Sequence, residues 1–190
     1  MRSIVYLLCS ILVTGAVAAE DKSPDGPQHV IEYLTLDAAL NKVFAEADSV
    51  WQVDWSPADA QRRRIERRLG WRLADSSFAI HRGVGEGVDL GCAIVGNEIG
   101  LYKPITFLVH VDGEGKVSSV QVMVFRESRG GEVRRRRFLT QYAGKSVRSP
   151  IRINRDIIGV TGATLSVRAV NAGVKKALAI VEAFRTSEAE

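Results

Sequence analysis

The sequence has few of the residue types that define specialised protein classes. Its 190 residues include only two cysteines, five prolines and three histidines, and aromatic residues make up 7% of the chain. Two cysteines are too few for a disulfide scaffold, and 17 glycines without a fixed period exclude a collagen-like chain. The histidines His29, His81 and His110 lack the spacing of metal ligands, and the sequence contains no nucleophile elbow, phosphate-binding loop or paired-carboxylate motif. We therefore expect no metal site and no catalytic residues, so that any chemistry would come from a bound cofactor.

What is present is an ordinary globular composition. Hydrophobic residues make up 46% of the chain and charged residues 25%, and the formal net charge at pH 7 is +4. A chain of this length fits one domain, since domains commonly have about 100–200 residues. Composition alone indicates a single, slightly basic domain and names no activity.

The N-terminus has the pattern of a signal peptide. Arg2 precedes an apolar run over residues 4–13, and small residues follow at 16–19. The apolar run is shorter than the roughly 20 residues that a membrane-spanning helix needs. We therefore expect export to the periplasm with removal of residues 1–19; a segment retained as a membrane anchor is the alternative. Cleavage would leave Cys92 as the sole cysteine, in an apolar stretch where we expect a small buried side chain.

Two helices are expected near the start of the domain. A turn-rich linker over residues 20–33 is followed by apolar residues at helical spacing over 36–47, and a second helical pattern covers 57–69. The outer face of the second helix carries a run of arginines: Arg62, Arg63, Arg64, Arg67 and Arg68. Such a run is usually a solvated helix face; a docking surface for an acidic redox partner or for anionic lipid headgroups is the alternative.

Antiparallel strands are expected in the middle of the chain. Residues 78–81 and 92–95 flank a glycine-rich stretch, which predicts a hairpin with an open turn. The glycines of that stretch are Gly83, Gly85, Gly87 and Gly91. Residues 105–111 and 117–125 are joined by Asp-Gly-Glu-Gly at 112–115, a strong hairpin signal. Successive strands between helices at both ends of the chain predict a single α+β domain with a twisted, mainly antiparallel sheet.

The most informative segment is Thr-Gly-Ala-Thr-Leu-Ser at 161–166. Apolar residues then recur every three or four positions, which predicts an amphipathic helix from near Thr164 to about Arg185. A hydroxyl residue at a helix start can cap the free amides of the first turn. The same place is an anion site, because free N–H groups and the positive end of the helix dipole favour a phosphate. From these residues alone, capping and phosphate binding both stay open.

The Thr-Gly-Ala-Thr-Leu-Ser segment resembles the Ser/Thr-Gly-Ala-Thr flavinylation motif of the FMN-binding domain family, which includes the C and G subunits of the sodium-pumping and Rnf-type oxidoreductases. In that family the last threonine of the motif carries FMN through a phosphoester bond, placed by a flavin transferase that uses FAD. The matching residue here is Thr164. The resemblance implies that the other residues of the motif also contact the FMN: Thr161, Gly162, Ala163, Leu165 and Ser166.

Three further blocks resemble the family in the same order along the chain. Residues 98–107 resemble its strand before the first central hairpin, 127–132 its glycine-containing loop, and 138–145 the segment after that loop. The resemblance implies an FMN-binding domain over 34–186, and the likeness is greatest to the small, stand-alone exported members. The family usually has Asp at the position of Ile158, whereas the nearest Asp here lies two residues earlier.

The loop at 127–132 is the expected contact for one side of the flavin ring, because its glycine amides could approach the ring closely. The candidate residues are Glu127, Arg129, Gly130 and Gly131. A hairpin connection that uses glycines for positive φ is the alternative. The four consecutive arginines at 134–137 are expected to be solvated or strand-edge charge, or to steer an acidic partner.

Together these features predict an exported flavoprotein that carries electrons in a periplasmic or membrane-associated redox chain. It is not expected to be an enzyme with acid–base residues of its own, and its FMN is expected on Thr164. The expected partners are the flavin transferase and redox proteins; nucleic acid is not expected, because interleaved stacking aromatics are lacking. The alternative is a non-redox exported binding module, in which the Thr-Gly-Ala-Thr turn only caps a helix or binds FMN noncovalently.

Overall fold

The structure is a computed structural model, and it describes residues 29–188. The expected signal peptide lies outside the described residues, and so does the expected linker up to residue 28. At the end of that linker the chain forms the short strand β1 (Ile31–Glu32). Within residues 29–188, no helix is both long enough and apolar enough to cross a bilayer.

Six antiparallel strands form one sheet in the order β1-β6-β5-β4-β3-β2. From β2 to β6, strands that are consecutive in the chain are also neighbours in the sheet, and β1 pairs with the end of β6. The strands after β1 are β2 (Ser49–Trp55), β3 (Phe78–Gly85), β4 (Val88–Ile99), β5 (Pro104–Val111) and β6 (Val117–Phe125). The expected antiparallel α+β domain is confirmed, including the hairpin between β5 and β6.

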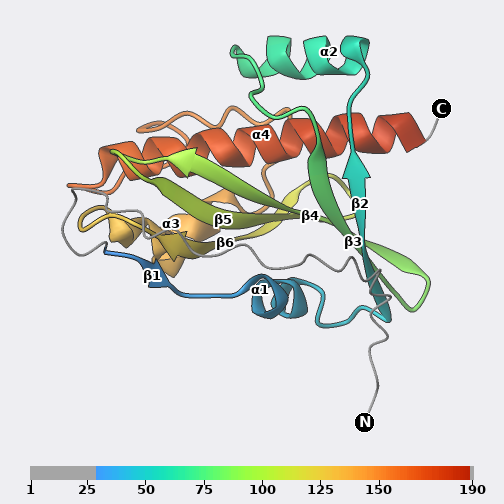
Figure 1. Ribbon diagram of the computed structural model, residues 1–190, viewed down its shortest axis with the longest axis horizontal. Coiled ribbons are helices and arrows are strands. Elements are labelled where there is room, and N and C mark those ends of the chain that lie inside the picture. The colour runs from blue at the N-terminus through green and yellow to red at the C-terminus, as the bar shows by residue number, and fades with distance from the viewer. Residues whose placement is uncertain (1–28, 189–190) are drawn as a thin grey trace, which may run out of the picture.

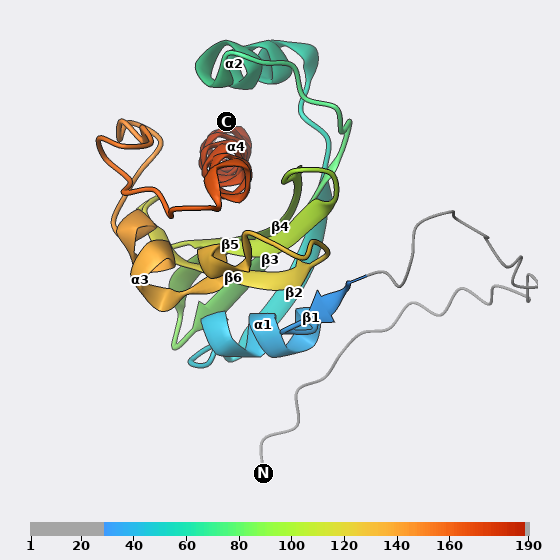
Figure 2. The same ribbon diagram turned by 90° about the vertical axis from the view of Figure 1, so that its left-hand side faces the viewer.

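Helices cover both faces of the sheet (Figures 1 and 2). The C-terminal helix α4 (Thr164–Glu188) lies along one face with α2 (Asp59–Leu69) beyond it, and α1 (Leu36–Val43) lies on the opposite face. The expected C-terminal helix and the expected helix at 57–69 are thus confirmed. The helix expected at 36–47 is shorter, because Phe44 leaves it to place its ring against Gly83 of β3.

After β6 the chain forms three short helical segments in place of another strand. They are the 3-10 helix η1 (Gly131–Arg134), the helix α3 (Arg136–Leu139) and the 3-10 helix η2 (Thr140–Tyr142). The alternative in which residues 127–132 connect a hairpin is therefore wrong. The arginines at 134–137 are exposed, as expected of solvated charge, but they lie on η1, on α3 and between these two, and not at a strand edge.

The glycine-rich stretch between residues 81 and 92 is strand and not an open loop. The chain reverses at Glu86 and Gly87, whose φ angles are 51° and 76°. A Cβ on Gly83 would lie 2.4 Å from Cδ1 of Phe44, and one on Gly85 would lie 2.2 Å from the carbonyl oxygen of Glu46. The expected open turn is therefore wrong: these glycines let the segment after α1 pack closely against β3.

The arginine-rich face of α2 is largely solvated, as expected. Arg63, Arg64 and Arg67 are exposed. Arg62 differs, because its guanidinium turns back and donates to the carbonyl oxygens of Leu73 and Asp75. It therefore ties the segment after α2 to the helix.

The lone described cysteine, Cys92 in β4, is buried as expected, with 1% of its surface exposed. It belongs to the apolar cluster between the sheet and α4. Burial raises the pKa of its thiol to about 11. Because only the thiolate is nucleophilic, the side chain is inert near neutral pH.

The approach of α4 to the sheet depends on Gly173. A Cβ at this position would lie 1.9 Å from Cζ of Phe107 in β5 and 3.2 Å from Cγ of Glu98 in β4. The Phe107 ring is fully buried, so it cannot move out into solvent without disturbing the core. Near this contact, Lys176 of α4 pairs with Glu98 at 2.6 Å. Only glycine therefore allows this distance between helix and sheet.

We expect Gly173→Ala to destabilise the domain. Alanine ordinarily stabilises a helix interior by about 1 kcal/mol relative to glycine. Here the overpacking against Phe107 should outweigh that gain and lower the free energy of unfolding by about 1–3 kcal/mol. Urea unfolding followed by circular dichroism measures the change, and an increase in stability would contradict the packing argument.

Candidate functional site

The Thr-Gly-Ala-Thr turn lies where α4 begins. Thr164 is the first residue of the helix, and the carbonyl of Ala163 accepts the first intrahelical hydrogen bond, from the amide of Val167 at 2.9 Å. The amides of the first turn have no partner inside the helix. Thr164 is exposed, and within residues 29–188 its hydroxyl has no hydrogen-bond partner. Thr164 therefore does not cap α4, and its hydroxyl is open to solvent at the positive end of a long helix.

The residues before Thr164 set the shape of the turn. Gly162 has a φ of 80°, a left-handed conformation that favours glycine, and Thr161 is exposed beside it. Ala163 is 2% exposed, and its amide donates to the carbonyl of Val160 at 3.0 Å. The motif thus combines a buried alanine that anchors the turn with two exposed threonines, of which only Thr164 lies on the helix.

The loop after β6 packs directly on the first turn of α4. Gly130 has a φ of 89°, and a Cβ there would lie 2.3 Å from Oγ of Ser166, which is itself buried. Gly131 lies against the ring of Phe125: a Cβ on Gly131 would be 3.6 Å from Cε1 of that ring. The two sequence segments that were expected to share the FMN site, 127–132 and 161–166, are therefore adjacent in space.

Glu127 joins a third segment to this arrangement. Its Oε1 accepts hydrogen bonds from the backbone amides of Tyr102 at 2.6 Å and Lys103 at 2.9 Å. The side chain is 9% exposed, and a Cβ on Gly100 would lie 3.0 Å from its Oε2. Glu127 therefore fastens the β4–β5 turn to the loop after β6, and its Oε1 is committed to backbone amides.

The β4–β5 turn contributes apolar side chains that sequence reasoning did not assign to the site. Leu101 is 47% exposed and Tyr102 is 77% exposed, and Leu165 on the first turn of α4 is 39% exposed. Figures 1 and 2 show this turn and the loop after β6 at the end of the molecule where α4 starts. Exposed apolar groups beside a free hydroxyl provide a surface for a flat aromatic ligand. The sequence alone did not assign Leu101 and Tyr102 to the site, because only the fold shows that they are exposed.

The position at which the family usually has Asp lies just outside this arrangement. Ile158 is 76% exposed, and its backbone is held at both ends by the side chain of Gln141: its amide donates to Oε1 at 2.7 Å, and its carbonyl accepts from Nε2 at 3.2 Å. Asp156 is paired with Arg152, with 2.8 Å between Oδ2 and Nε, which lowers the pKa of the carboxyl. Asp156 is thus committed to its own turn.

The cations near the site are exposed. Arg129 and the arginines at 134–137 are all exposed, and the Arg134 guanidinium lies 4.8 Å from the centroid of the Tyr33 ring. None of the arginines at 134–137 forms an ion pair with a described residue. The loop after β6 therefore leads into a strip of unneutralised positive charge.

The arrangement fits an FMN phosphate ester. The free hydroxyl and free amides lie at the start of α4, Gly130 gives the loop a close approach, and the exposed apolar groups of Leu101, Tyr102 and Leu165 lie on neighbouring segments. Such a site needs an anion anchor and an apolar wall, and this chain has both.

Glu127→Ala should loosen the β4–β5 turn. The substitution leaves the amides of Tyr102 and Lys103 without their acceptor, which we expect to cost about 1–3 kcal/mol of stability. Faster hydrogen exchange at these two amides, measured by NMR, checks the effect. Glu127→Gln keeps an acceptor oxygen and is the matched control. Equal exchange rates in the native protein and Glu127→Ala would show that the carboxylate does not hold the turn.

Comparison with known proteins finds a matching family for the region around the Thr-Gly-Ala-Thr turn. The family model described as FMN-binding domain matches residues 100–179, which include the β4–β5 turn, the loop after β6 and much of α4. Among solved structures, NqrC of Shewanella oneidensis has a similar fold, with a TM-score of 0.57 and 15% sequence identity over 79% of this chain and 88% of that one. No curated protein sequence matches the chain. Residues 100–179 therefore match the FMN-binding domain family, and the chain as a whole shares its fold with NqrC.

Proposed function

We propose that the protein is an exported electron carrier whose FMN is joined to Thr164 by a phosphoester bond. The observation that carries the proposal is the exposed Thr164 hydroxyl, which begins α4 and has no hydrogen-bond partner among the described residues. A threonine that served only as a helix cap would use its oxygen to accept from an amide of the first turn. The noncapping position of Thr164 therefore favours attachment over the alternative of a simple cap.

The attachment would be a phosphoryl transfer from FAD. The Thr164 oxygen attacks the phosphorus next to riboflavin, a new oxygen–phosphorus bond forms, and the pyrophosphate bond breaks. AMP leaves, and the hydroxyl proton passes to a base of the flavin transferase. The product is a phosphodiester with one negative charge, which the free amides and the dipole at the start of α4 stabilise.

The remaining residues of the site would hold the flavin in place. The flavin, when bound, supplies the capacity to accept and donate electrons. Leu101, Tyr102 and Leu165 offer apolar surface that excludes water from part of the ring, and Gly130 lets the loop after β6 lie against Ser166 on the first turn of α4. Because Glu127 ties the β4–β5 turn to the same loop, this surface is in place before the cofactor arrives.

The place of action would be the periplasm, where a covalent bond prevents loss of the cofactor by dilution. The pattern of residues 1–19 supports export, and the arginines at 134–137 would attract an acidic redox partner near the site. Noncovalent FMN binding on the same surface is the second candidate, favoured by Ile158 at the position where the family usually has Asp.

Coexpression with a flavin transferase tests the covalent bond. The intact mass of the protein should rise by one FMN less one water, and flavin fluorescence should stay with the protein after denaturation. Thr164→Ala should abolish the mass increase because it removes the attacking oxygen. Thr164→Ser should retain it, and Thr161→Ala should retain it because Thr161 lies outside the helix.

The outcomes separate the candidates. An unchanged mass with one equivalent of FMN released on denaturation would support the noncovalent site and overturn the phosphoester. Loss of attachment in Thr161→Ala but not in Thr164→Ala would show that the wrong threonine was assigned.

A further inference from the structure

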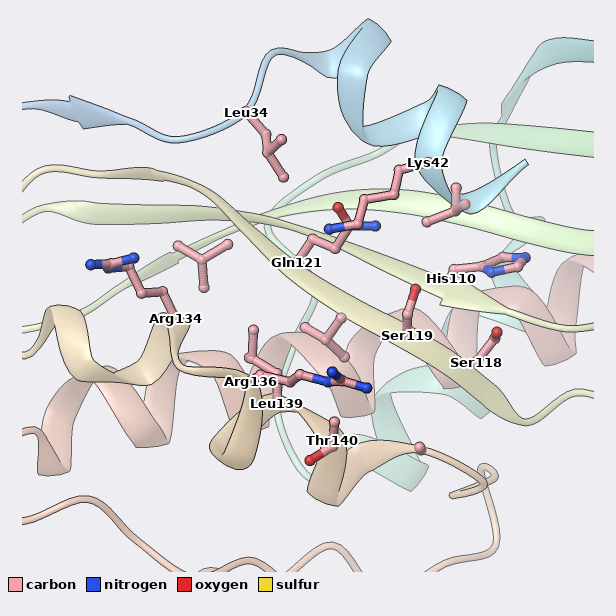
Figure 3. A pocket seen from close by; sticks show the side chains of 14 residues that line it. Leu34, Lys42, His110, Ser118, Ser119, Gln121, Arg134, Arg136, Leu139 and Thr140 are labelled. Carbon is pink, nitrogen blue, oxygen red and sulfur yellow. The ribbon is translucent and has the colours of Figure 1, made fainter. Parts of the chain in front are cut away.

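A second cleft lies on the α1 face of the sheet. It has a volume of about 510 Å³ and is bounded by α1, β6 and the α3–η2 segment (Figure 3). None of the residues that line it is acidic. It contains none of the residues of the Thr-Gly-Ala-Thr turn or of the loop at 127–132. The proposed flavin attachment does not use this cleft.

The edge of β6 forms one wall of the cleft, and the middle of that edge is open. At one end, Val117 exchanges hydrogen bonds with Gly144 and Lys145. At the other end, the carbonyl of Met123 accepts from the amides of Tyr33 and Leu34. Between these ends, over residues 118–122, no backbone group of the described chain pairs with the side of β6 that faces away from β5. An unpaired strand edge of this kind is a template for another strand.

Positive charge borders the open edge. Lys42 of α1 and Arg136 of α3 are both exposed, and within residues 29–188 neither forms an ion pair. Figure 3 shows these two side chains reaching toward the cleft from opposite sides. His110 adds no charge at neutral pH, because burial lowers its pKa and outweighs the opposite effect of the Leu90 carbonyl oxygen, which lies 2.8 Å from Nε2. Together with the lack of acidic groups, the two cations favour an anionic occupant.

Gln121 in the cleft wall has a side-chain acceptor that no donor of the described chain reaches. Its side chain lies in the cleft wall and is 8% exposed, and its Oε1 is buried without any hydrogen-bond partner among the described residues. A buried acceptor without a donor costs free energy. A carboxylate or phosphate alone offers no donor to Oε1, whereas a peptide backbone offers N–H groups at a regular spacing.

We propose that this cleft binds an extended acidic peptide segment of a partner protein as an additional strand beside β6. The partner backbone would pair with the open edge over residues 118–122 and donate to Oε1 of Gln121. Its acidic side chains would lie against Lys42 and Arg136. Backbone pairing would supply affinity and the two cations would select the charge of the segment.

A capped short peptide in which glutamate alternates with valine provides the probe. Titration into the isotopically labelled protein should shift the NMR signals of residues 118–122 and slow amide exchange along the β6 edge. The same peptide with alternate backbone nitrogens methylated cannot pair as a strand and should not bind. A lysine–valine peptide should not bind either, because its charge is wrong for the cleft.

Single substitutions test whether Arg136 and Gln121 contribute to peptide binding. Arg136→Glu should weaken binding of the glutamate peptide by at least about tenfold, since it replaces an attraction by a repulsion. Arg63→Glu on α2 makes the same change of charge away from the cleft and is the matched control. Gln121→Leu should also weaken binding because it removes the acceptor, and its urea unfolding curve shows whether the fold is kept.

Three results would overturn the proposal. Equal binding of the N-methylated peptide would mean that no strand pairs with β6. Displacement of the peptide by free glutamate or inorganic phosphate at similar concentration would mean that the cleft is a small-anion site. Equal weakening by Arg63→Glu and Arg136→Glu would mean that the peptide responds only to net charge.

Discussion

The contact between Gly173 and Phe107 sets the depth at which α4 lies on the sheet, and the arrangement at the N-terminal end of the helix follows from it. A helix held one side chain further out would carry Ser166 away from Gly130. The loop after β6, which Glu127 joins to the β4–β5 turn, would then lose its contact with the first turn of α4. Tight packing near the middle of α4 thus determines which segments surround Thr164, although none of these packing residues belongs to the motif.

The sheet separates two surfaces with different chemistry. On the α4 face, the helix start offers a hydroxyl and free amides next to exposed apolar side chains. On the α1 face, the open edge of β6 offers backbone groups and cations. Val120, Gln121 and Val122 all border the cleft along the strand edge, but side chains alternate along a strand, and only the two valines also belong to the apolar cluster beneath α4. A ligand on one face leaves the other face free.

Local patterns were sufficient for part of the fold. The helical periodicity after Thr164 and the turn at 112–115 each depend on neighbours in the chain, and both predictions are confirmed. The strand β2 escaped prediction because most of its residues are exposed and show no buried face. The glycines of β3 were misassigned, because their use depends on Phe44 and Glu46, which approach from a different part of the chain. In the candidate site, the motif predicts a role for Thr164, whereas the partners of Glu127 are backbone amides, which leave no trace in sequence.

The burial of Cys92 makes the reactivity of its thiol depend on whether the chain is folded. A thiol with 1% exposure and a pKa of about 11 is closed to exchange once β4 and α4 have packed over it. Before that packing forms, the same thiol is exposed and titrates near its ordinary value, so the unfolded chain is the form that can become cross-linked to another protein.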